Sequence, residues 1–189
     1  MSSSTSKQDL TITNPALLVD GSDADFRVLI NRLLYFSTRL LSVRDGFGVI
    51  LGLTGIQFSI LISIRALSTE EDVTVNQLAD HLHLSGSFVT IETGKLQARG
   101  LVSKKRHHQD GRKIVLHITK EGRKLLGTLT STQQTINDML FAKLSAADFR
   151  NLNAIAERLV SNADVATLEL SHMVSKLNAQ PNALSHATE

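Results

Sequence analysis

The chain contains no cysteine and no tryptophan, and only 4% of its 189 residues are aromatic. The absence of cysteine excludes disulfide bonds, thiolate metal ligands and a cysteine redox switch. The two prolines, Pro15 and Pro181, lie near the ends, so no proline interrupts helices in between. Hydrophobic residues make up 42% of the chain, which is enough for a core that must be mainly aliphatic.

Targeting and catalytic signals are also scarce. No run of about 18 apolar residues occurs, and residues 1–10 lack the apolar centre of a signal peptide, so we expect a cytoplasmic protein. No glycine-rich phosphate loop, nucleophile elbow or zinc-protease motif is present. The pairs His81/His83 and His107/His108 do not place two ligands on one helical face. We therefore expect no enzyme activity, no metal and no cofactor.

Positive charge is concentrated in residues 85–124, although the whole chain carries a formal net charge of only +2. This stretch contains ten basic and three acidic residues, a net charge of +7, which leaves −5 for the rest of the chain. A local positive field favours a polyanionic partner such as nucleic acid. From charge alone, a solvated charged face is an equally good interpretation.

Hydrophobic spacing predicts helices in the first part of the chain. After a polar tail, a helix is expected to begin at Asp23 and to end near the glycines of residues 45–48. Capping-box patterns at residues 54–57 and 74–77 predict two further helix starts. The second of these helices is short, as the first helix of a helix-turn-helix motif usually is.

A turn follows, and after the next helix the spacing of apolar residues changes from the helical period to the period of two that is typical of strands. Residues 84–87 form a turn with capping residues, and the next helix should end at Gly100. Residues 101–106 and 113–118 then alternate with a period of two, which predicts a β-hairpin whose tip is residues 107–112.

The last part of the chain is predicted to be helical. Thr119 is expected to cap a helix that runs to about Lys143, and residues 145–148 should cap a final helix. The apolar positions of that final helix alternate spacings of three and four: Phe149, Leu152, Ala156, Leu159, Ala163, Ala166, Leu170, Met173 and Leu177. So long a seam predicts a partner helix, with a dimer interface that includes Phe149, Leu159, Leu170, Met173 and Leu177. An amphipathic helix that packs on its own domain is the alternative.

Together these elements predict a mainly α fold with a small β-hairpin wing, an α+β winged helix-turn-helix flanked by long dimerisation helices. We expect a flexible N-terminal tail at 1–22, a helical dimerisation region at 23–52 and 120–178, a DNA-binding domain at 53–119 and a C-terminal tail at 179–189.

The helix after residue 84 has the size to enter a major groove. The hydroxyl groups of Ser85, Ser87 and Thr90 can bind phosphate or base edges, although helix capping explains Ser85 and Ser87 equally well. Phe88 and Ile91 should point outward, where they can contact thymine methyl groups.

The tip of the hairpin, residues 107–112, is too polar to be a packing element. Arg112 can enter a narrow minor groove, and Asp110 can fix the turn by pairing with Arg112 or with its own backbone. The basic residues of the hairpin are expected to contact the DNA backbone: Lys104, Lys105, Arg106 and Lys113, with His108 at the tip. A solvated hairpin with an exposed ion pair is the alternative.

Several motifs follow one another in a fixed order and spacing. They are Leu53-Thr54-x-x-Gln57-Phe58, Thr74-x-x-Gln77-Leu78-Ala79-x-x-Leu82, Ser85-x-Ser87-x-Val89-Thr90, Lys95-Leu96-x-x-Arg99-Gly100-Leu101-Val102, Asp110-x-Arg112 and Leu116-x-Ile118-Thr119-x-x-Gly122. Over residues 53–126 this arrangement resembles the multiple antibiotic resistance regulator (MarR) family of winged helix-turn-helix transcription regulators.

The resemblance implies a homodimer that inserts two recognition helices and two wings into palindromic double-stranded DNA. Residues 87–95, including Lys95, match the recognition helix, and Asp110 and Arg112 match the wing pair. Family members are usually repressors released by small molecules, often phenolic or aromatic carboxylic compounds. A DNA-binding repressor is therefore the function implied, and a protein-interaction adaptor that uses the winged domain without DNA is the alternative.

The chain departs from the family pattern within the recognition helix. At the position of Ile91, family members often have a basic residue. At the positions of Glu92 and Gly94 they often have an aliphatic and an acidic residue, respectively. Glu92 can either orient Lys95 or accept a hydrogen bond from cytosine. The lack of cysteine excludes the peroxide-sensing mode of some relatives.

In this family an effector pocket lies between the dimerisation helices and the winged domain. The resemblance makes five residues candidates for such a site: Asn31, Arg32, Tyr35, Arg39 and Arg65. An arginine there could pair with a carboxylate. Exposed or interface positions with no ligand are the alternative, because charged residues are mostly exposed.

Overall fold

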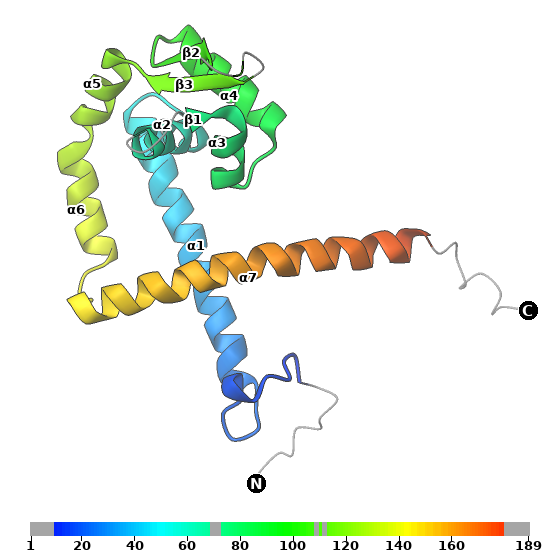
Figure 1. Ribbon diagram of the computed structural model, residues 1–189. Coiled ribbons are helices and arrows are strands. Elements are labelled where there is room, and N and C mark those ends of the chain that lie inside the picture. The colour runs from blue at the N-terminus through cyan, green and yellow to red at the C-terminus, as the bar shows by residue number, and fades with distance from the viewer. Residues whose placement is uncertain (1–9, 69–72, 108–109, 111–112, 180–189) are drawn as a thin grey trace, which may run out of the picture. The chain divides into compact units, whose positions relative to one another are not determined.

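The structure is a computed structural model that describes residues 10–68, 73–107, 110 and 113–179 (Figure 1). The chain divides into two compact units, Met1–Thr135 and Ile136–Glu189. Within the described residues, no single helix is long and apolar enough to cross a membrane, although the bent pair formed by the first two α-helices meets that test by length and composition.

The elements follow one another in a helix-rich order. They are a 3-10 turn η2 (Pro15–Leu17), α1 (Ala24–Ile50), α2 (Gly55–Leu67), β1 (Val73–Thr74), α3 (Val75–Leu82), α4 (Gly86–Ala98), β2 (Val102–Arg106), β3 (Ile114–Ile118), α5 (Lys120–Thr128), α6 (Thr130–Leu140) and α7 (Ala146–Ala179). The predicted fold class, mainly α with a small antiparallel wing, is confirmed.

The sheet has three strands rather than the two of the predicted hairpin. Its order is β1-β3-β2, and both pairings are antiparallel. Leu116 at the centre of β3 lies opposite Val73 of β1 on one side and Lys104 of β2 on the other. The additional strand β1 has only two residues, which is too short to produce a periodic sequence pattern.

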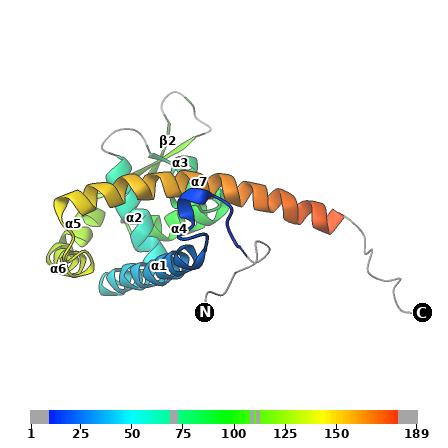
Figure 2. The ribbon, with the colours of Figure 1, turned by 90° about the horizontal axis from the view of Figure 1, so that it is seen from below.

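Helix α2 is the centre of the first unit. It packs against α1, α3, α4 and β3, and it contributes several fully buried side chains: Phe58, Ile60, Leu61 and Ile64. Helices α1 and α2 meet at 88° (Figures 1 and 2). Across this corner the rings of Phe47 and Phe58 pack edge to face, with their centroids 5.6 Å apart.

The first helix is predicted to stop near residues 45–48, and α1 continues past these glycines to end at Ile50. A Cβ atom on Gly48 would lie 2.8 Å from the carbonyl carbon and oxygen of Thr54, and one on Gly55 would overlap the Asp45 side chain. The glycines therefore permit the close approach of α2 rather than ending α1. The chain leaves the helix at Gly52, whose φ of +64° lies in the left-handed region.

The single helix expected from Thr119 to about Lys143 is wrong, because the structure divides it into α5 and α6. At the break, the N–H of Leu129 donates to the Leu126 carbonyl three residues back, at 3.2 Å, which tightens the turn. The Leu129 side chain is fully buried. Thr119 caps α5 as predicted, since its hydroxyl accepts from the Gly122 N–H at 3.0 Å.

The start of α1 is tied to the segment that precedes it. The backbone N–H and the hydroxyl of Thr11 both donate to the buried carboxylate of Asp23, at 2.8 and 2.6 Å, and Arg27 pairs with the same carboxylate at 2.9 Å. These hydrogen bonds from Thr11, aided by Arg27, lower the pKa of Asp23. Part of the 1–22 segment is thus attached to α1.

The second unit consists mainly of α7, a helix of 34 residues. Its start is a capping box: the Ser145 N–H donates to the Asp148 carboxylate at 2.9 Å, and the Ser145 hydroxyl accepts from the Asp148 N–H at 3.1 Å. The hydrogen bonds from Ser145 lower the pKa of Asp148. Every side chain described between residues 141 and 178 is exposed, so the apolar seam of α7 faces solvent in the single chain.

Candidate nucleic-acid interface

Helices α3 and α4 and the turn between them begin and end at well-defined caps. The Thr74 hydroxyl accepts from the Gln77 N–H at 3.2 Å, and the Gln77 side chain accepts from the Thr74 N–H at 2.9 Å. His83 ends α3 with a φ of +52°. Ser85 then caps α4 by accepting from the Phe88 N–H at 3.3 Å. The turn therefore points the N-terminal end of α4, with its free N–H groups, towards solvent.

Helix α4 buries one face and exposes another. Val89 and Leu96 are fully buried, as predicted. Phe88 and Ile91 point outward, with 38% and 57% of their surfaces exposed. The other predicted contact residues of this helix region are exposed as well: Ser85, Ser87, Thr90 and Lys95. One solvent-facing surface thus combines hydroxyl groups, two apolar side chains and an ammonium group.

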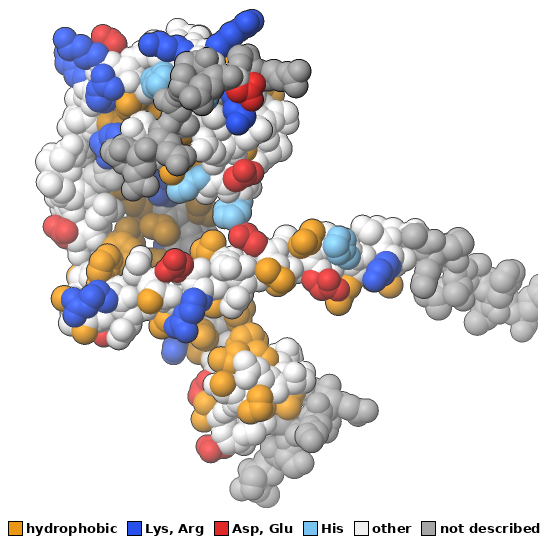
Figure 3. Space-filling model, in the orientation of Figure 1, with side chains coloured by type: hydrophobic (Ala, Val, Ile, Leu, Met, Phe, Trp, Pro, Cys, Tyr) orange, Lys and Arg blue, Asp and Glu red, His pale blue; other side chains and the backbone are white. Residues whose placement is uncertain are grey.

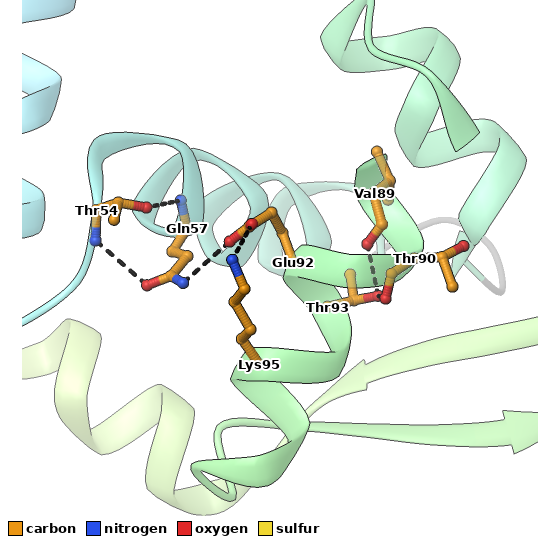
Figure 4. A network of polar contacts seen from close by, with 7 residues as sticks. All are labelled: Thr54, Gln57, Val89, Thr90, Glu92, Thr93 and Lys95. Carbon is orange, nitrogen blue, oxygen red and sulfur yellow. Dashed lines mark hydrogen bonds and ion pairs between the residues drawn. The ribbon is translucent and has the colours of Figure 1, made fainter. Parts of the chain in front are cut away.

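A polar network under α4 connects it to α2 (Figure 4). The Gln57 side chain accepts from the Thr54 N–H at 3.2 Å and donates to Glu92 at 3.0 Å. The second carboxylate oxygen of Glu92 accepts from the Lys95 ammonium at 2.6 Å. Glu92 is only 5% exposed. The hydrogen bond from Lys95 is the main cause of a lowered pKa for Glu92, and the bond from Gln57 adds to it.

The sequence left two roles open for Glu92, orienting Lys95 or accepting a hydrogen bond from cytosine. In the structure both carboxylate oxygens accept hydrogen bonds within the protein, from Gln57 and Lys95, which favours the first role. The part played by Gln57 was missed. Its capping-box position was visible in the sequence, but that pattern predicts only a helix start and not the second hydrogen bond of the same amide group.

Helix α4 is also attached to the wing. The Lys104 ammonium on β2 donates to the Thr90 carbonyl at 3.2 Å, and burial lowers the pKa of Lys104. The hydroxyl groups of Thr90 and Thr93 donate to carbonyls of their own helix, Gly86 at 2.8 Å and Val89 at 2.7 Å. Lys104 therefore fixes β2 against α4, and its contact with phosphate stays a prediction.

The described hairpin is basic and exposed towards its tip, whereas the parts of β2 and β3 further from the tip contribute buried apolar side chains. Lys105, Arg106 and Lys113 are exposed, and Figure 3 shows Lys and Arg side chains gathered at the end of the first unit that carries the sheet. The N–H of Asp110 donates to His107 at 3.2 Å, and its carboxylate lies 3.9 Å from the Lys113 ammonium. Asp110 thus fixes the turn through neighbours in the hairpin. His108 and Arg112 lie outside the described residues.

The remaining predicted site residues are on the surface of the chain. All five candidates for effector binding are exposed: Asn31, Arg32, Tyr35, Arg39 and Arg65. The Arg39 guanidinium lies 5.0 Å from the centre of the Tyr35 ring. The residues predicted for the dimer interface on α7 are exposed as well. Among the residues that the structure describes, no group of three or more His, Asp or Glu side chains could hold a metal ion.

The sequence and the fold are similar to those of known regulators. YdgJ, an uncharacterised HTH-type transcriptional regulator of Bacillus subtilis, is 24% identical over 109 residues, which is 58% of this chain and 66% of that protein, just under two thirds. The organic hydroperoxide resistance transcriptional regulator of the same organism is 24% identical over 122 residues, 65% of this chain and 80% of the relative.

A solved structure has the same fold. It is a mutant MarR from E. coli complexed with operator DNA, which is 19% identical, has a TM-score of 0.59 and covers 71% of this chain and 96% of its own. The MarR family model matches residues 51–113, the segment that contains α2, α3, α4 and β2. The chain is thus similar to the MarR family over residues 51–113 and shares the fold of solved MarR structures.

Proposed function

We propose that this protein is a homodimeric transcription regulator that binds palindromic double-stranded DNA in the cytoplasm. The observation that carries the proposal is the exposed face of α4, where two apolar side chains lie beside hydroxyl groups and an ammonium group. Phe88 and Ile91 would be costly to leave in water, but they suit thymine methyl groups in a major groove. The DNA-bound E. coli relative supports this use of the fold.

Each group on this face has a natural partner on duplex DNA. The free N–H groups at the start of α4 suit a phosphate, and the hydroxyl of Ser87 can add a hydrogen bond to it. The exposed cations of the hairpin, Lys105, Arg106 and Lys113, suit the phosphates on either side of the groove. Base edges are then left to Thr90, Ile91 and Lys95.

Selection of bound duplexes from a random library, followed by titration of the selected duplex, tests DNA binding. Arg106→Ala should weaken binding to all sequences alike and reduce the slope of log affinity against log salt by about 0.9. Arg150→Ala, which removes the same charge from α7, is the control and should leave the slope unchanged. Absence of any duplex binding at low salt would refute the function and favour a protein-interaction adaptor.

The dimer is proposed on the apolar seam of α7. Its residues repeat at heptad spacing over the whole helix, and Leu159 and Leu170 are 49% and 61% exposed in the single chain. Burying so continuous a stripe requires a second helix of similar length, and a second copy supplies one.

Sedimentation should find a dimer that Leu170→Glu dissociates. Val165→Glu, at a position on the same helix but off the seam, should leave the dimer intact. A wild-type monomer at micromolar concentration would contradict the proposal, and so would equal effects of the two substitutions.

We further propose repression that is relieved by a small aromatic or carboxylate effector. Arg65 on α2 and, separately, the Tyr35–Arg39 pair on α1 offer cationic and aromatic groups to which such a ligand could bind. Thiol oxidation is not available to this chain, because it has no cysteine. Benzoate is a simple probe. It should release bound DNA from the wild type, and the Arg65→Met protein should require a higher benzoate concentration for the same release. Release that is equal in both proteins would exclude Arg65.

A further inference from the structure

We propose that Glu92 is a specificity-determining residue of the recognition helix, because it holds the Lys95 ammonium at one position and so makes Lys95 read a hydrogen-bond acceptor on a base edge. The inference rests on the proposed DNA binding. Once the helix lies in the major groove, Lys95 contributes to the preference for one DNA sequence over others rather than to the affinity for DNA in general.

The first observation is that a carboxylate is buried beneath a surface that should attract DNA. A buried carboxylate is costly unless it is paired and hydrogen-bonded. Glu92 satisfies both conditions, since one oxygen accepts from Gln57 at 3.0 Å and the other from Lys95 at 2.6 Å. The 6% exposure of the Glu92 side chain contrasts with 57% for Lys95, so the pair extends from the core to the DNA-facing surface.

The second observation is that the anchor of this pair has little freedom to move. The other end of the Gln57 amide accepts from the Thr54 N–H, in the capping box that starts α2. That start is packed directly on α1, where a Cβ atom on Gly48 would meet the Thr54 carbonyl at 2.8 Å. The position of Glu92, and through it that of Lys95, is therefore set by the corner between α1 and α2.

A lysine held in this way acts differently from a free one. Its ammonium has three N–H donors, of which Glu92 takes one, and the others remain for acceptors such as O6 and N7 of guanine. Because the carboxylate compensates its charge, Lys95 adds little to the attraction for an arbitrary phosphate. The pair should therefore lower non-specific affinity while it retains the contact with the selected base.

A purely structural role for the pair makes a different prediction. If Glu92 and Lys95 only stabilised α4, removing the carboxylate would change the melting temperature and weaken binding to all duplexes by one factor. The ratio of specific to non-specific affinity and the salt dependence separate the two roles, because loss of folded protein changes neither for the fraction that remains folded.

The experiment compares Glu92→Gln with Asp80→Asn, which removes one negative charge from an exposed position on α3. The probes are the duplex selected by the wild type and a random-sequence duplex of equal length. For Glu92→Gln we expect the affinity ratio between them to fall about tenfold, with tighter random-duplex binding and a salt slope steeper by about 0.9. Asp80→Asn should change neither quantity, and a Glu92→Gln protein indistinguishable from it would overturn the inference.

Lys95→Met provides a second test at an exposed side chain, should Glu92→Gln fail to fold. It should lose the same preference for the selected duplex, and the double variant Glu92→Gln/Lys95→Met should lose no more than either single variant. A Lys95→Met protein that keeps its full preference would overturn the inference although DNA binding stands. A wild type that binds neither duplex would overturn the proposed function, and the inference with it.

Discussion

Two glycines on α5 should respond in opposite directions to the same substitution. A Cβ atom on Gly122 would overlap the Leu101 carbonyl oxygen and lie 2.9 Å from Cγ1 of Ile118, whereas one on Gly127 would meet nothing within 4 Å. Both positions gain helix propensity on changing to alanine. Only at Gly122 would the added methyl group have to displace neighbouring atoms.

The magnitude follows from what holds the Leu101 carbonyl. It accepts from the Thr119 N–H at 3.1 Å and from the Thr119 hydroxyl at 3.2 Å, so moving it strains or breaks bonds worth about 1 kcal/mol each. Overpacking adds about 1–3 kcal/mol, and the propensity gain offsets about 1 kcal/mol. We therefore expect Gly122→Ala to lower the free energy of unfolding by about 2–4 kcal/mol. Gly127→Ala should raise it by about 0.5–1 kcal/mol.

Thermal melting followed by circular dichroism at one protomer concentration measures both changes. For a chain of this size Gly122→Ala should lower Tm by about 4–16 °C, and Gly127→Ala should raise it by about 1–4 °C. Equal concentrations are essential, because association makes Tm depend on concentration. A Gly122→Ala protein that melts at or above the wild type would refute the packing argument, and a lower Tm for Gly127→Ala would refute the propensity argument.

Three further substitutions test the cap of α3, the core and the buried ion pair. Thr74→Ala removes the capping hydroxyl and should cost about 1 kcal/mol, measured as a lower urea midpoint with an unchanged slope. Phe58→Ala removes a ring that is 1% exposed and should cost about 3–5 kcal/mol by the same assay. The pKa of Glu92 is lowered from its ordinary value of 4.5, so its stabilisation is complete above pH 4.5 and is lost as pH falls through the folded pKa. Glu92→Gln should therefore flatten the loss of stability below pH 4.5, and an unchanged pH profile would contradict the pairing.

The sequence predicted the elements whose signals are local. Capping boxes at Thr54 and Thr74, the left-handed stop at Gly100 and the alternation of β2 and β3 all occur where the patterns indicated. Each depends on residues within four positions of one another, so one window of sequence contains the whole cause. The inward and outward faces of α4 follow from the same short spacing.

The features that the sequence did not predict depend on contacts between distant segments. Gly48 has the form of a helix stop, but its role is set by Thr54, which reaches it only after the chain has turned through the α1–α2 corner. Gln57 and Glu92 are 35 residues apart, and no local pattern links them. A capping residue and an unusual acidic residue were both visible, and their connection became visible only in three dimensions.

The order of the sheet has a consequence for the solubility of the protein. Among the described residues, β3 is paired on both sides and β2 pairs with β3 alone, so β2 is an edge of the sheet. Such an edge can pair with the edge of another molecule and begin aggregation. Successive Lys104, Lys105 and Arg106 make that pairing unfavourable, because two β2 edges would bring like charges together. Substitutions that neutralise β2 should therefore make the protein less soluble at high concentration.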